Sequence, residues 1–429
     1  MFGFANFLLL VLFAAAVFDL IFALARGGGL RGALHGLWNT PPLLFGQQLA
    51  EWRLQLGRIL FAAGLAAYEI SVVFCNSMAR QNWAWVQGVM SPVLEWLAFL
   101  CFGAKILFGT RYTWRELLAG GALYFIARWV YFNSQNIWWI GIVVAVLAAK
   151  DIPLRRPLQV YFASGCAAMA VVLALHFAGI VAPDLTSERM GALRGTYGYG
   201  HPNTFGGLVF GLVLAYALLR AQKVRWVDCL LVFAVGVFLL VGPASRSAAL
   251  CTLALAVGLV FCRLRAGHSV PRWWPGTCAG MVGLTAAVSY LLPLLVIKVG
   301  PWNNDIGPAW LAKLDSLLTC RISLTWMAYR LLDVKIAGQV FNWPTVDNSF
   351  AFALFQFGPV VAALLGILFA AALWGHAKQG RRVEVCCLFA MLAYAYMEVQ
   401  PFHLTTNPTA LLLCGAVFAQ TSARWQKIE

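Results

Sequence analysis

Long, nearly uninterrupted apolar runs recur along the chain and restrict its fold more than any other feature. They lie near residues 5–25, 57–75, 89–109, 117–133, 137–150, 158–182, 204–220, 226–243, 247–263, 274–297, 346–374, 382–398 and 408–421. A helix needs about 20 such residues to cross a bilayer core of about 30 Å, whereas a membrane β-barrel would show short alternating segments. We therefore expect an all-α, polytopic integral membrane protein with about 11–13 transmembrane helices.

Composition and charge exclude the other classes of protein. Hydrophobic residues make up 62% of the chain and charged residues 11%, against about 45–50% and about 25% in soluble domains, and disorder needs low hydrophobicity. The net charge of +15 concentrates in the connections 26–56, 110–116, 150–157, 220–225, 263–273, 375–381 and 422–429. Because cytoplasmic loops collect Lys and Arg, we expect these connections to be cytoplasmic, and nucleic acid is not an expected partner.

The predicted topology divides the chain into two units. Residues 1–56 are expected to form an N-terminal helix and a basic cytoplasmic loop, and residues 57–429 a polytopic membrane domain. The first run lacks a basic n-region and a small-residue cleavage site, so it reads as a retained helix rather than a signal peptide. The outer side then holds a short loop near 183–203 and one long extracellular loop at about 298–345. The 11 cysteines are interpreted as small buried hydrophobes, and no metal site is predicted.

The short outer loop carries the first unusual residues. Arg194 begins the stretch 194–206, in which three glycines allow tight backbone turns and His201 precedes a proline. The exposed amides at the start of the next helix would favour an anion. His201 alone is more often structural, but Arg194 and Asn203 at the same boundary favour a site.

Two further motifs fall on the predicted outer side. Arg246 lies in a Ser-Arg-Ser motif, either as a snorkelling anchor or as a cavity-lining residue. The long loop continues with Arg321, Gln339 and the pair Asp347-Asn348. Asp347 and Asn348 begin the next apolar run, where an acid or amide is often only a helix cap.

Carboxylates near the ends of runs complete the set. Glu398 lies across a short outer loop from Asn407, and an ionisable residue beside a membrane cavity is a functional candidate. Glu398 could equally pair with an outer arginine for structural reasons. Within the runs, Glu69 and Glu95 are expected to pair with basic residues such as Lys105 or Arg128.

The chemistry of this set points to a phosphate-bearing substrate. The guanidinium fork of arginine matches paired phosphate oxygens and stays charged, and phosphate substrates at an outer membrane face are chiefly lipid-linked. Arginines would neutralise the charge of a lipid phosphate or diphosphate leaving group. A His or a carboxylate would take the proton of the attacking hydroxyl.

The order of these motifs resembles a known family. G-x-G-H-P-N-T, S-R-S, R-x-S, G-Q, V-D-N-S-F and E…N follow one another as in the Wzy-type polysaccharide polymerases of the O-antigen ligase and polymerase superfamily, with most likeness to the Gram-positive exopolysaccharide and capsule branch. The segments 111–116 and 149–152 also look like cytoplasmic-loop patterns of that group. The resemblance covers about 50–429, and the leading run looks like an addition.

The resemblance implies an activity and a place in the cell. Such enzymes are GT-C-like glycosyltransferases of the bacterial cytoplasmic membrane. They join oligosaccharide repeat units carried on undecaprenyl diphosphate at the outer face, without a nucleotide sugar, a metal or another cofactor. A flippase and a chain-length regulator of the same pathway are the implied protein partners, besides the lipid bilayer.

The resemblance also assigns roles by position. Arg194 and Arg321 match the two loop arginines at the lipid diphosphate, and Arg246 matches the S-R motif. Asp347 stands where the ligase branch has a histidine, which favours a polymerase and leaves His201 as the better base candidate. The predicted catalytic residues are His201, Arg194, Arg321 and Asp347, and the predicted substrate-binding residues are Asn203, Arg246, Asn348, Gln339, Glu398 and Asn407.

Three alternatives stay open at this point. A ligase-like transferase would share the donor and differ in the acceptor, which the sequence does not reveal. A transporter or flippase for lipid-linked sugars should show symmetric halves and charges along a continuous path. A structural membrane protein would tolerate the loss of Arg321 and His201 without loss of product.

Overall fold

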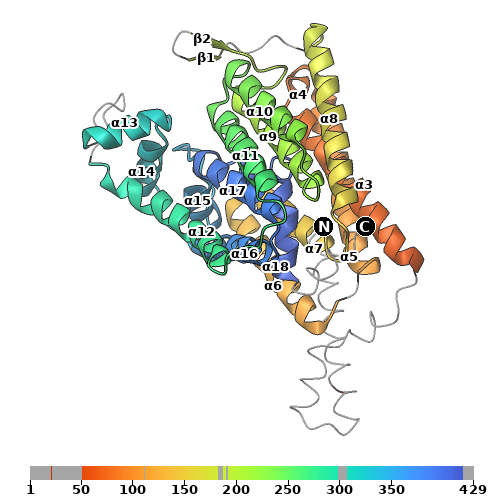
Figure 1. Ribbon diagram of the computed structural model, residues 1–429. Helices are drawn as coiled ribbons and strands as arrows, with labels where there is room; N and C mark the ends of the chain where they lie inside the picture. The colour runs from red at the N-terminus through yellow and green to blue at the C-terminus, as the bar shows by residue number, and fades with distance from the viewer. Residues whose placement is uncertain are drawn as a thin grey trace.

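Helices make up nearly all the regular structure of the computed structural model, which describes residues 21, 51–110, 112–181, 187–189, 192–297 and 307–418 (Figure 1). The first part contains α3 (Glu51–Cys75), α4 (Ala79–Asn82), η1 (Val86–Met90), α5 (Ser91–Phe108), α6 (Trp114–Ser134), α7 (Trp138–Ala148) and α8 (Arg155–Phe177). A small antiparallel hairpin of β1 (Ser187–Arg189) and β2 (Ala192–Arg194) follows, with Ser187 paired to Arg194.

The second part is again helical. It contains α9 (Pro202–Leu219), α10 (Trp226–Val241), α11 (Arg246–Leu264), α12 (Trp274–Leu291), η2 (Leu292–Leu295), α13 (Ala309–Leu317) and α14 (Arg321–Leu331). The C-terminal elements are α15 (Ser349–Phe352), η3 (Ala353–Phe357), α16 (Pro359–Lys378), α17 (Arg382–Met397), η4 (Gln400–Phe402), η5 (Pro408–Leu413) and α18 (Cys414–Val417). The predicted all-α class is confirmed, with the short hairpin as an addition.

Seven helical segments in the described part of the chain are long and apolar enough to cross a membrane. They are Glu51–Cys75, Val86–Phe108, Arg155–Phe177, Pro202–Leu219, Arg246–Leu264, Trp274–Leu295 and Pro359–Lys378. A polytopic membrane protein is therefore supported as predicted. The predicted run 5–25 lies outside the described residues, apart from position 21.

Other predicted runs are helical but short or interrupted. The segments Trp138–Ala148, Trp226–Val241 and Pro408–Val417 are apolar helices of 10–17 residues, shorter than the roughly 20 residues of a full crossing. The run predicted at 346–374 is broken at Gly358, which has φ 89° and separates η3 from α16. An added Cβ at Gly358 would overlap the carbonyl of Ile336, so only glycine fits this break.

Local sequence signals explain where several helices begin. Thr113 and Glu116 form a capping box at the start of α6: the Thr113 hydroxyl accepts from the Glu116 amide, and the Glu116 carboxylate accepts from the Thr113 amide at 2.8 Å. Pro202 occupies the first turn of α9, where a missing N–H costs nothing. The long loop predicted at about 298–345 contains α13 and α14, and its residues 298–306 lie outside the described residues.

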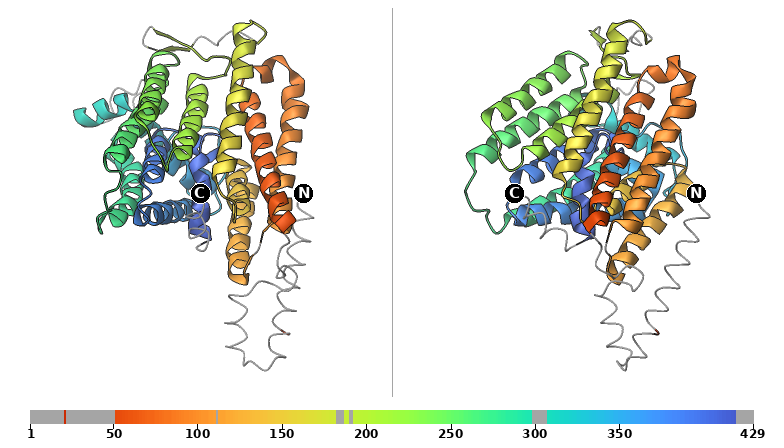
Figure 2. Two further views of the ribbon diagram at one scale, coloured as in Figure 1. Left: turned by 45° about the vertical axis from the view of Figure 1, so that its right-hand side comes forward. Right: turned by 90° about the vertical axis from the view of Figure 1, so that its right-hand side faces the viewer.

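The bundle brings the end of the chain next to helices from its middle. α3 packs against α5 and α8, α11 packs against α10 and α17, and α12 packs against α16. α17 and η5 also contact α9. Figure 2 shows α3, α5 and α8 standing side by side, with α9, α10 and α11 as a second group.

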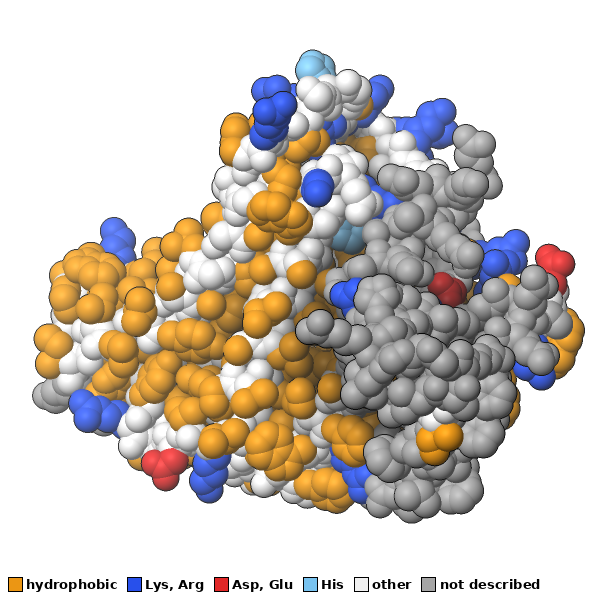
Figure 3. All heavy atoms as spheres, turned by 90° about the horizontal axis from the view of Figure 1, so that it is seen from below, with side chains coloured by type: hydrophobic (Ala, Val, Ile, Leu, Met, Phe, Trp, Pro, Cys, Tyr) orange, Lys and Arg blue, Asp and Glu red, His pale blue; other side chains and the backbone are white. Residues whose placement is uncertain are grey.

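The exposed surface fits a lipid environment. Large hydrophobic side chains such as Val241, Val257, Leu284 and Ile367 are more than half exposed. Seen from below, hydrophobic side chains cover much of the described surface (Figure 3). An apolar surface of this extent is stable only when it is covered by lipid or protein.

The structure bears on two further predictions: the boundary of the N-terminal unit and the ion pairs of Lys105. α3 begins at Glu51, so the last residues of the predicted N-terminal unit 1–56 belong to the first described helix. Lys105 donates a hydrogen bond to the carbonyl oxygen of Lys150, and among the described residues it forms no ion pair with Glu69 or Glu95. The predicted pairing with Lys105 is therefore wrong, because a backbone carbonyl satisfies this buried ammonium.

Candidate functional site

One carboxylate oxygen joins three separate parts of the chain. Oε1 of Glu398 accepts hydrogen bonds from Arg321 Nη2 at 2.6 Å, Ser247 Oγ at 2.8 Å and Asn203 Nδ2 at 3.0 Å. Glu398 directly follows α17, whereas its donors lie in the first turns of α14, α11 and α9. We call these four residues, together with Arg194, the Glu398 cluster.

Arg321 is held from every side of its guanidinium group. Nε donates to the carbonyl oxygen of Met397, and Nη1 donates to the carbonyl oxygen of Leu318 at 2.9 Å and to the hydroxyl of Thr319. Its side chain is only 7% exposed. The position is fixed by α14, which begins at Arg321 because the buried Asp315 carboxylate accepts the amides of the next two residues at 2.8 and 3.2 Å.

Arg194 reaches the same cluster through Asn203. Nη2 of Arg194 donates to Asn203 Oδ1 at 2.9 Å and to the carbonyl oxygen of Ala244 at 3.2 Å. The side-chain amide of Asn203 thus accepts a hydrogen bond from Arg194 through Oδ1 and donates one to Glu398 through Nδ2. The two arginines predicted to hold a diphosphate are therefore joined through Asn203 and Glu398, although they are 127 positions apart in the sequence.

Asp347 and Asn348 take different roles. Asp347 Oδ2 lies 3.9 Å from Arg321 Nη2, and its side chain is 31% exposed. Asn348 caps α15, since its Oδ1 accepts the amides of Phe350 at 2.9 Å and of Ala351 at 3.1 Å. The cap interpretation that the sequence left open therefore applies to Asn348, while Asp347 borders the Glu398 cluster.

His201 and Arg246 lie at the edge of the cluster and are exposed. His201 caps α9: its Nδ1 accepts the amide of Asn203 at 3.1 Å. A neutral imidazole that accepts at Nδ1 carries its proton on Nε2, so in this arrangement His201 serves as a cap. Arg246 is the first residue of α11, next to Ser247 of the cluster.

Gln339 and Asn407 are not brought to the cluster. The Gln339 side-chain amide donates to the carbonyl oxygen of Asp333, and its backbone amide donates to Gln356 at 3.3 Å. Asn407 Oδ1 caps η5 by accepting the amide of Ala410 at 3.1 Å. Both side chains stabilise their own loops in this structure.

The electrostatics of the cluster centre on Glu398. Burial raises the pKa of Glu398 from 4.5 to about 7, against the opposing effect of the neighbouring Arg321 charge, and Asp347 adds to the rise. Arg194 and Arg321 are joined here with the carboxylates of Glu398 and Asp347, and Arg246 lies at the edge of the group. The group is therefore most cationic when Glu398 is protonated, and an anion would be bound most readily in that state.

Sequence reasoning missed several side chains that complete the cluster. Ser247 was noted only as part of a motif, yet it bonds both Glu398 and, at 3.4 Å, Arg321. Gln400 donates to the carbonyl oxygen of Asn203 at 3.2 Å and accepts from Tyr394 at 2.7 Å. The only sequence signal was the glycine pair at 206–207: an added Cβ there would overlap Ser245 and Gln400.

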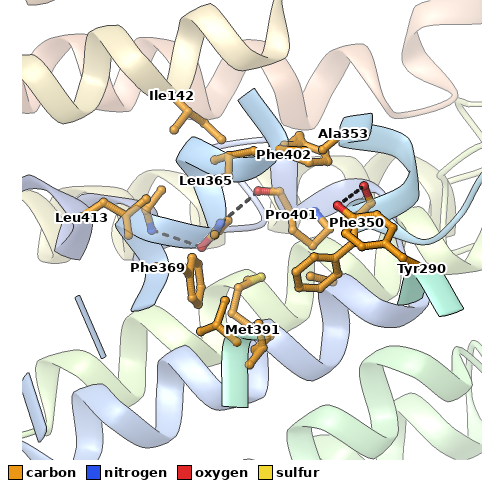
Figure 4. A pocket seen from close by; sticks show the side chains of 18 residues that line it. Ile142, Tyr290, Phe350, Ala353, Leu365, Phe369, Met391, Pro401, Phe402 and Leu413 are labelled. Atoms are coloured by element: carbon orange, nitrogen blue, oxygen red, sulfur yellow. Dashed lines mark hydrogen bonds between the residues drawn. The ribbon is translucent and has the colours of Figure 1, made fainter. Parts of the chain in front are cut away.

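An apolar pocket lies beside the cluster (Figure 4). Its walls come from α7, α12, the α15–η3 segment, α16, α17 and the η4–η5 segment, and they include Tyr290, Phe350, Phe369, Met391, Phe402 and Leu413. Ser349 also lines the pocket, and its hydroxyl donates to the carbonyl oxygen of Glu398. Ser349 thus connects the wall of the pocket to the backbone of Glu398.

A second apolar hollow lies beside α17. It lies between α12 and α17 and is lined by Leu284, Thr285, Val288, Ala393, Tyr396 and Met397. Its end at Met397 adjoins the cluster, because the Met397 carbonyl oxygen accepts from Arg321. Met397 therefore lies between this hollow and the guanidinium group of Arg321.

The arrangement can bind an anion by exchange of partners. Protein oxygens now occupy the N–H groups of Arg321, and a phosphate oxygen could replace the Glu398 carboxylate with similar geometry. Searches against protein-family models, curated proteins and solved structures find no match to this chain.

Proposed function

We propose that this protein is a membrane glycosyltransferase that polymerises undecaprenyl-diphosphate-linked oligosaccharide repeat units into exopolysaccharide or capsule. The proposal places the reaction at the outer face of the bacterial cytoplasmic membrane. Its main support is the convergence of Arg194 and Arg321 on one cluster from distant parts of the chain. The order of the sequence motifs, which resembles that of the Wzy-type polymerases, favours a polymerase.

The reaction would be a displacement at the anomeric carbon of the donor sugar. The acceptor hydroxyl oxygen forms the new bond to this carbon, the bond from this carbon to the phosphate oxygen breaks, and the lipid diphosphate leaves with the electron pair. Arg194 and Arg321 would stabilise the charge that develops on the leaving group. The hollow between α12 and α17 would take the first part of the lipid chain, since it ends beside Arg321.

Asp347 is favoured as the acceptor of the hydroxyl proton. Its side chain is partly exposed and meets Arg321 only at 3.9 Å, whereas His201 Nδ1 is occupied by a backbone amide. Glu398 Oε1 is occupied by three donors. A carboxylate that is free to move toward substrate suits general base work better than one fixed by its neighbours.

Purified protein with lipid-diphosphate-linked repeat units tests this proposal. We expect a ladder of products from the wild type, with and without EDTA, and none from Arg194→Ala or Arg321→Ala. Arg330→Ala is the matched control, because Arg330 lies on the same helix as Arg321 and its guanidinium group lies over the ring of Trp326. A single transfer to a non-repeat acceptor would support a ligase instead, and movement of the lipid-linked sugar across vesicles without product would support a flippase.

A further inference from the structure

Two cysteine thiols meet where α11 ends and α17 begins. The Sγ atoms of Cys262 and Cys386 lie 3.5 Å apart. Cys262 is the third residue from the end of α11, and Cys386 is the fifth residue of α17. Both are free cysteines, and the proposed chemistry uses neither. We call them the thiol pair.

A glycine on α11 makes room for the thiol pair. Gly258 lies one turn before Cys262, and a Cβ added at Gly258 would be only 3.1 Å from Cys386 Sγ. Small residues of this kind let two helices approach closely in a membrane. A disulfide needs an S–S distance of about 2.05 Å, so the two sulfur atoms have only about 1.5 Å left to close.

The thiol pair adjoins the basic connections predicted to be cytoplasmic. Arg382 begins α17 one turn before Cys386, and its guanidinium group donates to the carbonyl oxygen of Arg265 at 2.8 Å and to that of His268. This contact joins the connection after α11 to the start of α17. Cys386 is partly exposed whereas Cys262 is buried, so an oxidant reaches Cys386 first. Because the cytoplasm keeps thiols reduced, the dithiol is the resting state.

Hydrogen peroxide converts such a pair into a disulfide in two steps. The Cys386 sulfur attacks one peroxide oxygen, the O–O bond breaks, and a sulfenic acid and one water form. The Cys262 sulfur then attacks the Cys386 sulfur, the S–O bond breaks, and the second oxygen leaves as water. Each thiol proton ends on the departing hydroxide. The two sulfur atoms together lose two electrons, and the peroxide gains them.

The helices of the thiol pair carry the Glu398 cluster at their other ends. α11 packs against α17 (Figure 1), Ser247 is the second residue of α11, and Glu398 directly follows α17. At about 1.5 Å per residue, Ser247 lies about 22 Å from Cys262 along α11, and Glu398 lies about 18 Å from Cys386. Ser247 Oγ donates to Glu398 Oε1 at 2.8 Å. A covalent bond at one end therefore restrains the two helices that meet in the cluster at the other.

We infer that Cys262 and Cys386 form a reversible disulfide under hydrogen peroxide, which fastens α11 to α17 and slows the reaction at the Glu398 cluster. Formation of the disulfide does not depend on the proposed function, whereas its effect on product formation rests on that function. The reaction slows because Glu398 has to leave Arg321 before a phosphate binds there, and the disulfide restricts this movement. A thiol reductant restores the dithiol by exchange.

Oxidation of the purified full-length protein tests the disulfide without catalysis. After treatment with hydrogen peroxide and alkylation of the remaining thiols, peptide mass spectrometry should find the Cys262 and Cys386 peptides joined, with the loss of two hydrogen atoms. Dithiothreitol should separate them, and Cys386→Ser should abolish the link. Cys387→Ser is the matched control, because Cys387 is the next residue in the chain and is buried. It should leave the link intact.

A second variant keeps both thiols and tests their contact. The Cβ of Gly258→Ala meets Cys386 Sγ at 3.1 Å, so it should slow formation of the disulfide by roughly tenfold, since the rate depends on access to the sulfur. Gly283→Ala is its control, because no atom lies within 4 Å of the added Cβ. Unlinked peptides from the oxidised wild type, a link through Cys387 instead, or equal rates in the two glycine variants would overturn the disulfide.

Ladder formation separates the disulfide from the proposed function. We expect the oxidised wild type to form product at least twofold more slowly than the reduced protein, and the same treatment to leave the rate of Cys386→Ser unchanged. Linked peptides with unchanged ladder formation would overturn the restraint of α11 against α17. Linked peptides from a protein whose reduced form makes no ladder would leave the disulfide standing and would overturn the polymerase proposal alone.

Discussion

Arg321 Nη2 and Glu398 Oε1 meet at 2.6 Å, and both side chains are at most 7% exposed. Burial of two charges is costly, and removal of one partner leaves the other uncompensated. This pair therefore ties α14 of the long loop to the end of α17. In the proposed function a phosphate would have to replace Glu398 at the guanidinium group.

Glu398→Gln is expected to destabilise the protein by about 3–5 kcal/mol, since a buried guanidinium loses its carboxylate. The double variant Arg321→Gln/Glu398→Gln should recover part of this loss. The midpoint of thermal unfolding in detergent measures both effects. Arg220→Gln is the control, because that arginine is 32% exposed in its pair with Asp228 and should cost about 1 kcal/mol or less. An equal loss of stability in Glu398→Gln and Arg220→Gln would contradict a buried pair of Arg321 and Glu398.

Asn203 and Ser247 are expected to act together, because both donate to the same oxygen of Glu398. The effects of Asn203→Ala and Ser247→Ala on stability should differ from additivity by about 0.5–3 kcal/mol. A double-mutant cycle of thermal unfolding measures this coupling. Strict additivity would indicate that the shared oxygen does not link them.

Gly207→Ala is expected to abolish product formation. An added Cβ there would overlap the Gln400 amide and crowd Tyr394, which displaces Gln400 from the carbonyl oxygen of Asn203. Gly103→Ala is the matched control, since no atom lies within 4 Å of its added Cβ. Both variants are measured for ladder formation and for expression in the membrane. Full activity in Gly207→Ala would show that the position of Gln400 is unimportant.

Anion binding should weaken as pH rises through about 7. The pKa of Glu398 is raised to about 7 by burial, so above that pH the carboxylate competes with a phosphate for Arg321. Inhibition of the polymerase by inorganic diphosphate, measured from pH 5.5 to 8.5, should weaken as pH rises through about 7. Glu398→Gln should remove this pH dependence, and an unchanged pH dependence in that variant would refute the role of Glu398.

The sequence predicted the class of fold well because long apolar runs leave few alternatives. It could not show that the run at 346–374 is broken at Gly358, since this break depends on the close approach of the loop that contains Ile336. The short helix α7 was visible as a short run, but its place among other elements is a tertiary property.

The sequence indicated which polar residues would gather at one place only in part. Arg194, Asn203, Arg321 and Glu398 are joined by hydrogen bonds. Asn203, Arg321 and Glu398 lie at the start or end of a helix, and Arg194 ends strand β2. Gln339 and Asn407 carry the same polar character, but they satisfy their own loops. Only three-dimensional structure separates these two cases, since a cap and a ligand-binding amide have the same sequence signature.

Product analysis with lipid-diphosphate-linked repeat units and purified protein is the decisive test of the role of the Glu398 cluster. We expect a ladder from the wild type and from Arg330→Ala, and no ladder from Arg194→Ala or Arg321→Ala that remain folded in detergent. A ladder of wild-type length and yield from folded Arg321→Ala would contradict the claim that the Glu398 cluster carries the reaction.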